Sequence, residues 1–195
     1  MSDQQTIEVY NQKTQDYVNL IDRKPGSSLI EFVKKIPHSG RVLDLGCGPG
    51  TASAFMKSKG LFSDAVDASS EMVEFANFTY DLGAKMSRFS DITGDAIYDG
   101  VWANFSLLHV SKLEFIIHLK AIYKILKVNG SFSIGMKLGE GEHRDSLGRY
   151  YAYYSKSELL DNLSSIGFVF EAEYNGEEKG LAGRVEPWII LRFYK

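Results

Sequence analysis

Residues 42–51 read VLDLGCGPGT, and this stretch constrains the fold more than any other part of the sequence. Its apolar first half predicts a short buried strand, and the glycine-rich run that follows predicts a loop. Gly46, Gly48 and Gly50 let the backbone turn sharply and approach a ligand with no side chain in the way. A helix is expected to begin near Pro49, because proline is well tolerated in a first helical turn, and the free N–H groups there can meet a carboxylate. The sequence therefore predicts a strand–loop–helix unit that binds a ligand at its turn.

The spacing of these glycines distinguishes between classes of nucleotide site. A nicotinamide-binding loop has the pattern G-x-G-x-x-G, whereas this loop reads G-x-G-x-G and places Thr51 where the third glycine is expected. The sequence has no G-x-x-x-x-G-K-[ST] run, which argues against a phosphate-cradling loop. Asp44 lies inside an apolar strand, where a carboxylate is costly unless something binds it. Asp67 ends the next predicted strand, where it can accept both hydroxyls of a ribose; the alternative is that it caps the following helix.

Predicted strands and helices alternate along most of the chain. The hydrophobic spacing predicts helices over residues 5–22, 28–35, 51–59, 70–83, 112–127 and 155–165. It predicts strands over 41–45, 62–67, 85–90, 98–103, 131–136, 168–174 and 186–194, and loops over 139–150 and 175–184. This order implies an α/β fold in which a doubly wound, mostly parallel sheet of seven strands has helices on both faces. Because no helix separates the last two strands, the last strand is expected to insert antiparallel.

Composition and charge exclude several classes of protein. The chain has 195 residues, 44% hydrophobic and 24% charged, with a net charge of −3, which is typical of a single soluble domain over residues 1–195. No basic stripe indicates a nucleic-acid partner, and no apolar run reaches the roughly 18 residues that span a bilayer. The lone Cys47 cannot form an internal disulfide, which fits a cytoplasmic location. The four histidines lack metal-ligand spacing, so we expect no metal site; the oligomeric state stays open.

Four segments together carry a resemblance to a known family. These are VLDLGCGPGT at 42–51, AVDASSEMVEFA at 65–76, YDGVWANFSLLHV at 98–110 and LKVNGSFSIGMK at 126–137. The chain resembles the class I S-adenosylmethionine-dependent methyltransferases, in particular the small-molecule branch that is similar to methyltransferase types 11 and 25. The resemblance covers about residues 7–195. It implies a Rossmann-like fold, S-adenosylmethionine as cofactor and S-adenosylhomocysteine as product, with residues 1–36 as an N-terminal helical lid or cap.

The same resemblance implies a set of cofactor-binding residues. Gly46 and Gly48 would contact the methionine part through their backbone, with Cys47 between them, and Asp44 would act on its amino group through water. Asp67 would hold the ribose. The remaining implied contacts are to the sugar, the adenine and the cofactor's amino group, from Ala68, Met72, Asp91, Ile92 and Asn104. Ordinary packing is an equal alternative for Met72, and capping of a turn is an alternative for Asp91.

Candidate catalytic and substrate residues lie after the fourth and fifth predicted strands. His109 can act as a general base for an acceptor hydroxyl, since its reference pKa is near 6.5, although a histidine that orients the loop is the favoured interpretation. Tyr17 is a lid candidate, whereas simple packing is favoured for Tyr10. The stretches at 137–145 and 149–154 are rich in Glu, Arg and Tyr and can recognise a small polar or aromatic acceptor. The candidate acceptor-binding residues in these two stretches are Glu140, Glu142, His143, Arg144, Tyr150 and Tyr151.

The residues that end the fourth strand bear on the acceptor. Related enzymes that methylate base amines or glutamine amides often carry Asn/Asp-Pro-Pro-Tyr/Phe here, whereas this chain has Asn-Phe-Ser-Leu at 104–107. We therefore predict methyl transfer to a small molecule by in-line displacement, in which positioning supplies much of the effect. The alternatives are a protein or RNA methyltransferase and a non-catalytic nucleotide-binding module.

Overall fold

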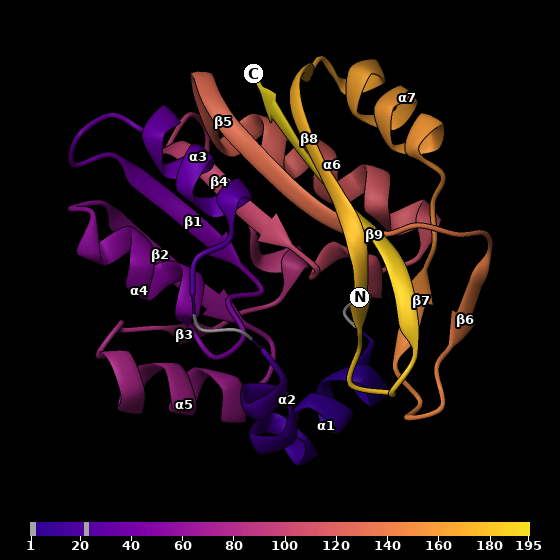
Figure 1. The fold of residues 1–195 in the computed structure, drawn as a ribbon. Coiled ribbons are helices and arrows are strands. Elements are labelled where there is room, and N and C mark those ends of the chain that lie inside the picture. The colour runs from indigo at the N-terminus through magenta and orange to yellow at the C-terminus, as the bar shows by residue number, and fades with distance from the viewer. Residues whose placement is uncertain (1–2, 22–23) are drawn as a thin grey trace.

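The computed structural model describes residues 3–21 and 24–195. Within these residues the main sheet has seven strands in the order β3-β2-β1-β4-β5-β9-β8 (Figure 1). Helices flank this sheet on both faces, which confirms the predicted α/β fold class. The strands are β1 (Arg41–Leu45), β2 (Phe62–Asp67), β3 (Lys85–Met86), β4 (Tyr98–Asn104), β5 (Leu126–Lys137), β8 (Val169–Lys179) and β9 (Val185–Tyr194).

Strand direction also follows the prediction. The first five strands along the chain pair in parallel, and β9 lies antiparallel between β5 and β8. The insertion of an antiparallel last strand is therefore confirmed. The sheet grows outward from β1 in one direction through β2 and β3, and in the other through β4 and β5. At such a switch point the loops that follow two neighbouring strands diverge and leave a crevice for a ligand.

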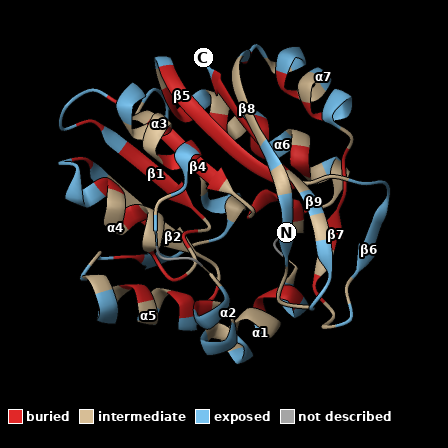
Figure 2. Ribbon diagram, in the orientation of Figure 1, coloured by how far each residue is buried: buried red, intermediate tan, exposed pale blue. Residues whose placement is uncertain are grey.

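Two helical layers bury the sheet. On one face lie α3 (Ser27–Lys35), α4 (Thr51–Ser58) and α5 (Ser70–Tyr80), where Phe32 and Met56 pack on Val42 and Trp102. On the other face lie α6 (Lys112–Ile125) and α7 (Lys156–Ile166), which contribute to the largest core cluster. Figure 2 shows β1, β4 and β5 buried along most of their length between these layers. The central strands are therefore rigid supports for the loops at their carboxyl ends.

The N-terminal segment differs from the single helix predicted over 5–22. The structure has α1 (Gln4–Gln12) and α2 (Thr14–Leu20) instead, and residue 22 lies outside the described residues. Lys13 has non-helical angles, and the Thr14 hydroxyl donates a hydrogen bond of 2.7 Å to the Tyr10 carbonyl. A side chain that bonds to the backbone in this way competes with the helical ladder. The break lets α1 and α2 take different directions over the ends of the strands (Figure 1).

Two predicted loops are wrong because they contain strands. Residues 139–150 include β6 (Glu142–Arg144), which pairs antiparallel with β7 (Tyr150–Ala152). The first half of residues 175–184 continues β8 as far as Lys179, which pairs with Val185 of β9, and residues 180–184 form the loop of the hairpin. Both segments extend away from the core, so polar residues occupy both faces of these strands. The apolar alternation that signals a half-buried strand is therefore missing from them.

Gly50 offers a test of how the loop is packed. Its φ is +86°, and a Cβ there would lie 2.5 Å from Leu82 Cδ1 and 2.9 Å from Ala76 Cβ. We expect Gly50→Ala to lower the free energy of unfolding by about 3 kcal/mol, through left-handed strain plus overpacking. Urea denaturation measures this loss. Gly60→Ala is the matched control, because Gly60 has a φ of +80° but nothing within 4 Å of its Cβ position. Equal losses in the two variants would show that packing against Ala76 and Leu82 contributes nothing.

Candidate functional site

A cavity of about 150 Å³ opens at the carboxyl ends of β1, β2 and β4. Its floor is the glycine loop between β1 and α4, and its walls come from the ends of β2 and β4. Helices α1 and α2 contribute Tyr10, Tyr17 and Ile21 to the opposite side. The predicted cofactor residues that line this cavity are Asp44, Gly46, Cys47, Gly48, Asp67, Ala68, Met72 and Asn104.

Two predicted cofactor residues lie elsewhere. Asp91 is exposed in a short 3-10 helix, η1 (Phe89–Asp91), where its carboxylate accepts a 2.8 Å hydrogen bond from the Arg88 backbone N–H. Ile92 packs against the main core cluster instead. Ser87 and Phe89 line the cavity at this wall. The strand β3 has two residues rather than the six predicted, so the residues that follow it and line the cavity come earlier in the sequence than Asp91 and Ile92.

Asp67 is held by the backbone of two loops. Its Oδ2 accepts a hydrogen bond from Gly48 N and its Oδ1 accepts one from Ser69 N, each 2.8 Å long. The helix-cap role belongs to Ser69, whose hydroxyl accepts from Met72 N at the start of α5. Burial raises the pKa of Asp67, although these N–H groups oppose the shift. Each carboxylate oxygen keeps a further lone pair, so the group can still accept hydrogen bonds from a ligand.

Asp44 is the second buried carboxylate of the cavity. It is 1% exposed, and its Oδ2 accepts a 2.6 Å hydrogen bond from the Ser53 hydroxyl of α4. Burial raises the pKa of Asp44 to about 7, and the negative charge of Asp67 adds to the shift against the hydrogen bond from Ser53. A positively charged group in the cavity would favour the ionised form.

Gly48 leaves room for a ligand over the loop. Its φ is +52°, and the nearest atom to a Cβ there would be Tyr17 Cε1 at 3.9 Å. Gly46 differs, because a Cβ there would lie 2.3 Å from the Cβ of Ser106. The glycine at 46 is thus needed for packing and the one at 48 for an open backbone surface. An open backbone beside two buried carboxylates fits a ligand that carries both an amino group and ribose hydroxyls.

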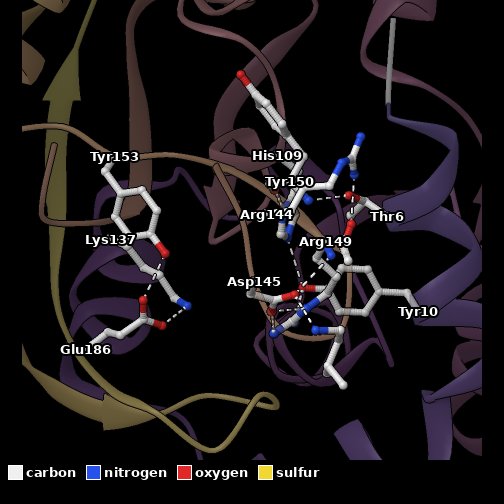
Figure 3. Close-up of polar contacts among 12 residues, drawn as sticks. Thr6, Tyr10, His109, Lys137, Arg144, Asp145, Arg149, Tyr150, Tyr153 and Glu186 are labelled. Atoms are coloured by element: carbon white, nitrogen blue, oxygen red, sulfur yellow. Dashed lines mark hydrogen bonds and ion pairs between the residues drawn. The ribbon is translucent and has the colours of Figure 1, made fainter. Parts of the chain in front are cut away.

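His109 has both ring nitrogens engaged (Figure 3). Its Nδ1 lies 2.6 Å from the Tyr150 carbonyl oxygen, and its Nε2 lies 2.9 Å from the Tyr10 hydroxyl. A carbonyl only accepts, so Nδ1 carries the proton and Nε2 accepts from Tyr10. Burial lowers the pKa of His109 to about 3, so the ring is neutral. The lone pair of its Nε2 is already used, which leaves no free basic nitrogen toward the cavity.

The Tyr10 hydroxyl also accepts a 2.9 Å hydrogen bond from Arg149 Nη1. Arg149 is 2% exposed and donates from Nε and Nη2 to Asp145. Two further contacts hold α1 at this place: Arg144 forms an ion pair with Asp3, and the Thr6 hydroxyl accepts from Tyr150 N. Figure 3 shows these groups converging between α1 and the β6–β7 hairpin.

A second cavity of about 110 Å³ adjoins the first. Tyr10, Tyr17, Ile21 and Phe105 line both cavities. Of the predicted substrate residues, Tyr17 and Tyr151 line the second cavity. Residues of the second cavity that sequence reasoning did not single out include Leu108, Lys137, Arg149, Glu178, Glu186 and Trp188.

The other predicted substrate residues line neither cavity. Glu140 is exposed, and His143 stacks on Tyr153 with ring centroids 4.5 Å apart. Glu142 accepts from the Tyr150 hydroxyl at 2.5 Å, so both are engaged on the outside of the hairpin. Arg144 contacts Asp3, as described above. The β6–β7 pairing turns these side chains outward, and the sequence contained no signal for that pairing.

Among residues 3–21 and 24–195, no three His, Cys, Asp or Glu side chains are grouped so that they could hold a metal ion. Over the same residues, no helix combines the length and the apolar character that crossing a bilayer requires.

Comparison with known proteins shows similarity to methyltransferases. A family model described as a methyltransferase domain matches residues 42–130. An uncharacterized methyltransferase of Staphylococcus carnosus (strain TM300) is 30% identical over 132 residues, which is 67% of this chain and 64% of that protein. The cypemycin N-terminal methyltransferase of a Streptomyces species is 33% identical over 132 residues, or 63% of this chain and 54% of that protein. The match thus spans less than two thirds of these relatives' length.

Solved structures share the fold. A Burkholderia thailandensis 1,6-didemethyltoxoflavin-N1-methyltransferase, solved with S-adenosylhomocysteine and 1,6-didemethyltoxoflavin, superposes with a TM-score of 0.78 at 20% identity, covering 97% of this chain and 84% of that one. The [4+2]-cyclase SpnF superposes with a TM-score of 0.72 at 16% identity, covering 96% of this chain and 94% of that one. The chain therefore carries a methyltransferase-domain match over residues 42–130 and shares the fold of S-adenosylmethionine-dependent methyltransferases. Its glycine loop and Asp67 lie at the carboxyl edge of the sheet.

The pKa of Asp44 makes stability depend on pH. Its folded-state pKa is about 7 against an ordinary value of 3.8, so the folded state binds the proton more tightly. The free energy of unfolding should therefore fall as pH rises from about 4 to about 7. The raised pKa of Asp67 also makes the free energy of unfolding fall with rising pH, whereas the lowered pKa of His109 makes it rise. The contribution of Asp44 is therefore obtained by comparing the unaltered protein with Asp44→Asn. The difference in unfolding free energy between the two proteins should change with pH, by up to about 1.4 kcal/mol per pH unit. Urea denaturation across this range tests it; parallel pH curves would contradict the prediction.

The hydrogen bonds of His109 predict a role in holding α1. We expect His109→Asn to keep the bond to Tyr150 and to lose the one to Tyr10, so amide exchange in residues 4–12 should accelerate about ten-fold. Tyr10→Phe should give a similar acceleration, and the double variant should add little to either. Hydrogen–deuterium exchange measures this.

Tyr150→Phe is the control, because it removes only the hydroxyl that bonds Glu142 and leaves the backbone contacts in place. Unchanged exchange in His109→Asn would show that the side chain does not anchor the helix.

Proposed function

We propose that this protein transfers a methyl group from S-adenosylmethionine to a small-molecule acceptor, leaving S-adenosylhomocysteine. One observation carries the proposal: the cavity built on the glycine loop and Asp67 shares a wall with a second cavity, whose lining includes five aromatic side chains. Two adjoining pockets are what a transfer between two bound molecules requires. The methyltransferase-domain match supports the cofactor, and the Burkholderia thailandensis neighbour was solved with bound 1,6-didemethyltoxoflavin, a small molecule.

The residues of the first cavity fit the cofactor. When bound, it supplies a methyl group that is already activated on a positively charged sulfur. We assign the ribose to Asp67, whose oxygens each retain an acceptor site, and the amino group to the region of Asp44. The open backbone at Gly48 accommodates the methionine part. Cys47, Ala68, Met72 and Asn104 complete the contact surface of the cavity as predicted from sequence.

The base end of the cofactor calls for a revised assignment. We propose Ser87 and Phe89 for it, in place of Asp91 and Ile92, because the former pair lines the cavity. Phe89 offers an aromatic surface for stacking, and Ser87 offers a hydroxyl that can donate or accept.

The protein's own contribution is positioning and exclusion of water. Tyr10, Tyr17 and Phe105 lie between the two cavities and define where the molecules bound in them meet. A partly dry site favours a reaction in which positive charge is dispersed. We propose that His109 is a positioning residue, since its Nε2 lone pair is occupied by Tyr10. The acceptor is then a group that is nucleophilic without a strong protein base.

Two of the similar proteins have names that point to functions other than methyl transfer to a small molecule. The cyclase SpnF shares this fold, which means that the fold can carry chemistry other than methyl transfer. The name of the cypemycin relative points to a peptide N-terminus as acceptor. The second cavity, at about 110 Å³, favours a small molecule over a folded protein or RNA.

Calorimetry with S-adenosylhomocysteine, NAD and ATP tests the cofactor assignment. We expect binding of S-adenosylhomocysteine and no comparable binding of the other two. Binding of NAD but not of S-adenosylhomocysteine would overturn the proposal.

Asp67→Asn tests the ribose contact. The amide keeps the side-chain shape and one oxygen acceptor but loses the charge, so S-adenosylhomocysteine affinity should fall about ten-fold or more. Asp64→Asn is the matched control on the same strand, since Asp64 bonds Arg41 and Tyr98 away from the cavity. Thermal denaturation checks that both variants fold. Unchanged affinity in Asp67→Asn removes this residue from the site.

A further inference from the structure

Three of the five charged side chains that line the second cavity are in ion pairs. Lys137 forms an ion pair with Glu186, and Arg149 forms one with Asp145, which is not itself a lining residue. Glu178 and Lys179 are consecutive at the end of β8 and supply one charge of each sign. A charged acceptor would have to separate one of these pairs, and separation leaves a half-buried charge without its partner. The cavity therefore favours an uncharged molecule.

Flat side chains form much of its wall. Tyr10 and Tyr17 meet edge to face with ring centroids 5.7 Å apart, and Phe105 and Trp188 do so at 6.1 Å. Tyr151 adds a fifth ring to the lining. Ring faces and edges of this kind favour a planar ligand, which stacks on one ring while its rim meets another.

Three polar groups gather at one end of the cavity. Lys137 on β5 pairs with Trp188 across the ladder to β9, and Glu186 lies two residues before Trp188, on the same face of that strand. Lys137 donates to Glu186, and its Nζ lies 4.1 Å from the ring centroid of Tyr151. Figure 3 shows Lys137, Glu186 and Tyr153 converging beside the strands.

These groups retain unused hydrogen-bonding capacity. An ammonium has three N–H donors, and Lys137 uses one of them within the described residues, in its hydrogen bond to Glu186. Glu186 accepts from Lys137 and, at 2.9 Å, from the Tyr153 hydroxyl, which leaves lone pairs on its carboxylate. The Trp188 indole N–H is buried and has no hydrogen-bond partner within the described residues. An unpaired buried donor in a cavity wall calls for an acceptor on a ligand.

The protonation state of Glu186 determines which groups at this end of the cavity donate hydrogen bonds and which accept them. Burial works against its ionisation, but the hydrogen bonds from Lys137 and Tyr153 outweigh burial and lower the pKa of Glu186. Glu186 is therefore an acceptor, placed directly beside the donor Lys137. The complementary ligand edge has an acceptor next to a donor, and a further acceptor for Trp188.

We propose that the methyl acceptor is an uncharged, flat heteroaromatic molecule whose edge carries a ring carbonyl beside a ring N–H. The carbonyl accepts from Lys137, the ring N–H donates to Glu186, and a second acceptor atom on the ring meets the Trp188 indole. Lys137, Glu186 and Trp188 are thus specificity-determining residues of the second cavity. This inference rests on the proposed function, since it names the class of molecule that occupies the pocket beside the cofactor.

Calorimetry on the full chain, saturated with S-adenosylhomocysteine, tests the class. The probes are quinazolinone, which has the carbonyl and N–H edge, quinazoline, which is the same bicycle without that edge, and the anion naphthoate. We expect quinazolinone to bind about ten-fold more tightly than either of the others, since two hydrogen bonds distinguish it from quinazoline. Equal or tighter binding of quinazoline or naphthoate overturns the proposal, and so does binding of none of the three.

Variants assign the contacts. Trp188→Phe keeps an aromatic ring and removes the N–H, and Lys137→Met keeps the stem and removes the ammonium. Lys137→Met should reduce quinazolinone affinity about ten-fold and leave quinazoline affinity unchanged. Trp188→Phe should reduce the affinity for both probes by about the same factor, because quinazoline keeps the second ring acceptor. Lys127→Met is the matched control, because it also removes the ion pair of a lysine on β5, here with Asp99, but Lys127 lies outside the cavity. Unchanged quinazolinone affinity in Trp188→Phe overturns the assignment.

The binding of S-adenosylhomocysteine distinguishes a failure of the proposed function from a failure of the proposed acceptor class. Every variant should retain it, which shows that the protein folds and that the first cavity is intact. Loss of S-adenosylhomocysteine binding in the unaltered protein contradicts the proposed function. Retained S-adenosylhomocysteine binding without a preference for quinazolinone contradicts only the acceptor class.

Discussion

The Tyr10 hydroxyl is the contact on which the arrangement of the site depends. It accepts from Arg149 and donates to His109, and its side chain lines both cavities. If α1 moved away, His109 Nε2 would lose its hydrogen-bond partner and Arg149 one of its acceptors. Leaving buried polar groups unpaired costs about 1–3 kcal/mol each. Closure of the cavities is therefore linked to the hydrogen bonding of the core beneath them.

Two buried carboxylates give the first cavity its electrostatic character. Asp44 and Asp67 end neighbouring strands, and their hydrogen bonds within the described residues come from a hydroxyl and from backbone N–H groups rather than from cations. Burial raises the pKa of both, so in the free protein each resists ionisation. This arrangement costs stability and favours a ligand with a positive group and several hydroxyls.

The second cavity has a different physical basis. Its walls come from segments that leave the core, namely the β8–β9 hairpin, the end of β5 and the stretch around Tyr151. Three of its five lining charges are in ion pairs and its rings are flat, so shape and hydrogen bonding select the ligand more than net charge does. The sheet supports the glycine loop directly, whereas the second cavity depends on how the hairpin and α1 pack against one another.

The sequence alone determined the α/β order, the antiparallel last strand and the residues around the glycine loop. Each of these depends on local signals: hydrophobic spacing, glycine placement and a carboxylate at the end of a strand. Eight residues predicted for the cofactor line one cavity because the carboxyl ends of parallel strands meet at one edge. Asp91 lies outside the lining of this cavity because β3 ends after two residues, and the length of β3 is set by pairing with β2, for which a two-residue strand has no clear sequence signal.

Only the tertiary structure decided the second cavity and the state of His109. Lys137 and Trp188 are far apart in sequence and meet through the β5–β9 register. Likewise, Tyr10 lies 99 positions from His109, and no periodicity links them. Hydrogen bonds between distant segments depend on packing, and packing has no local sequence signal. The sequence therefore determined where a ligand could bind, and the fold decided which side chains surround it.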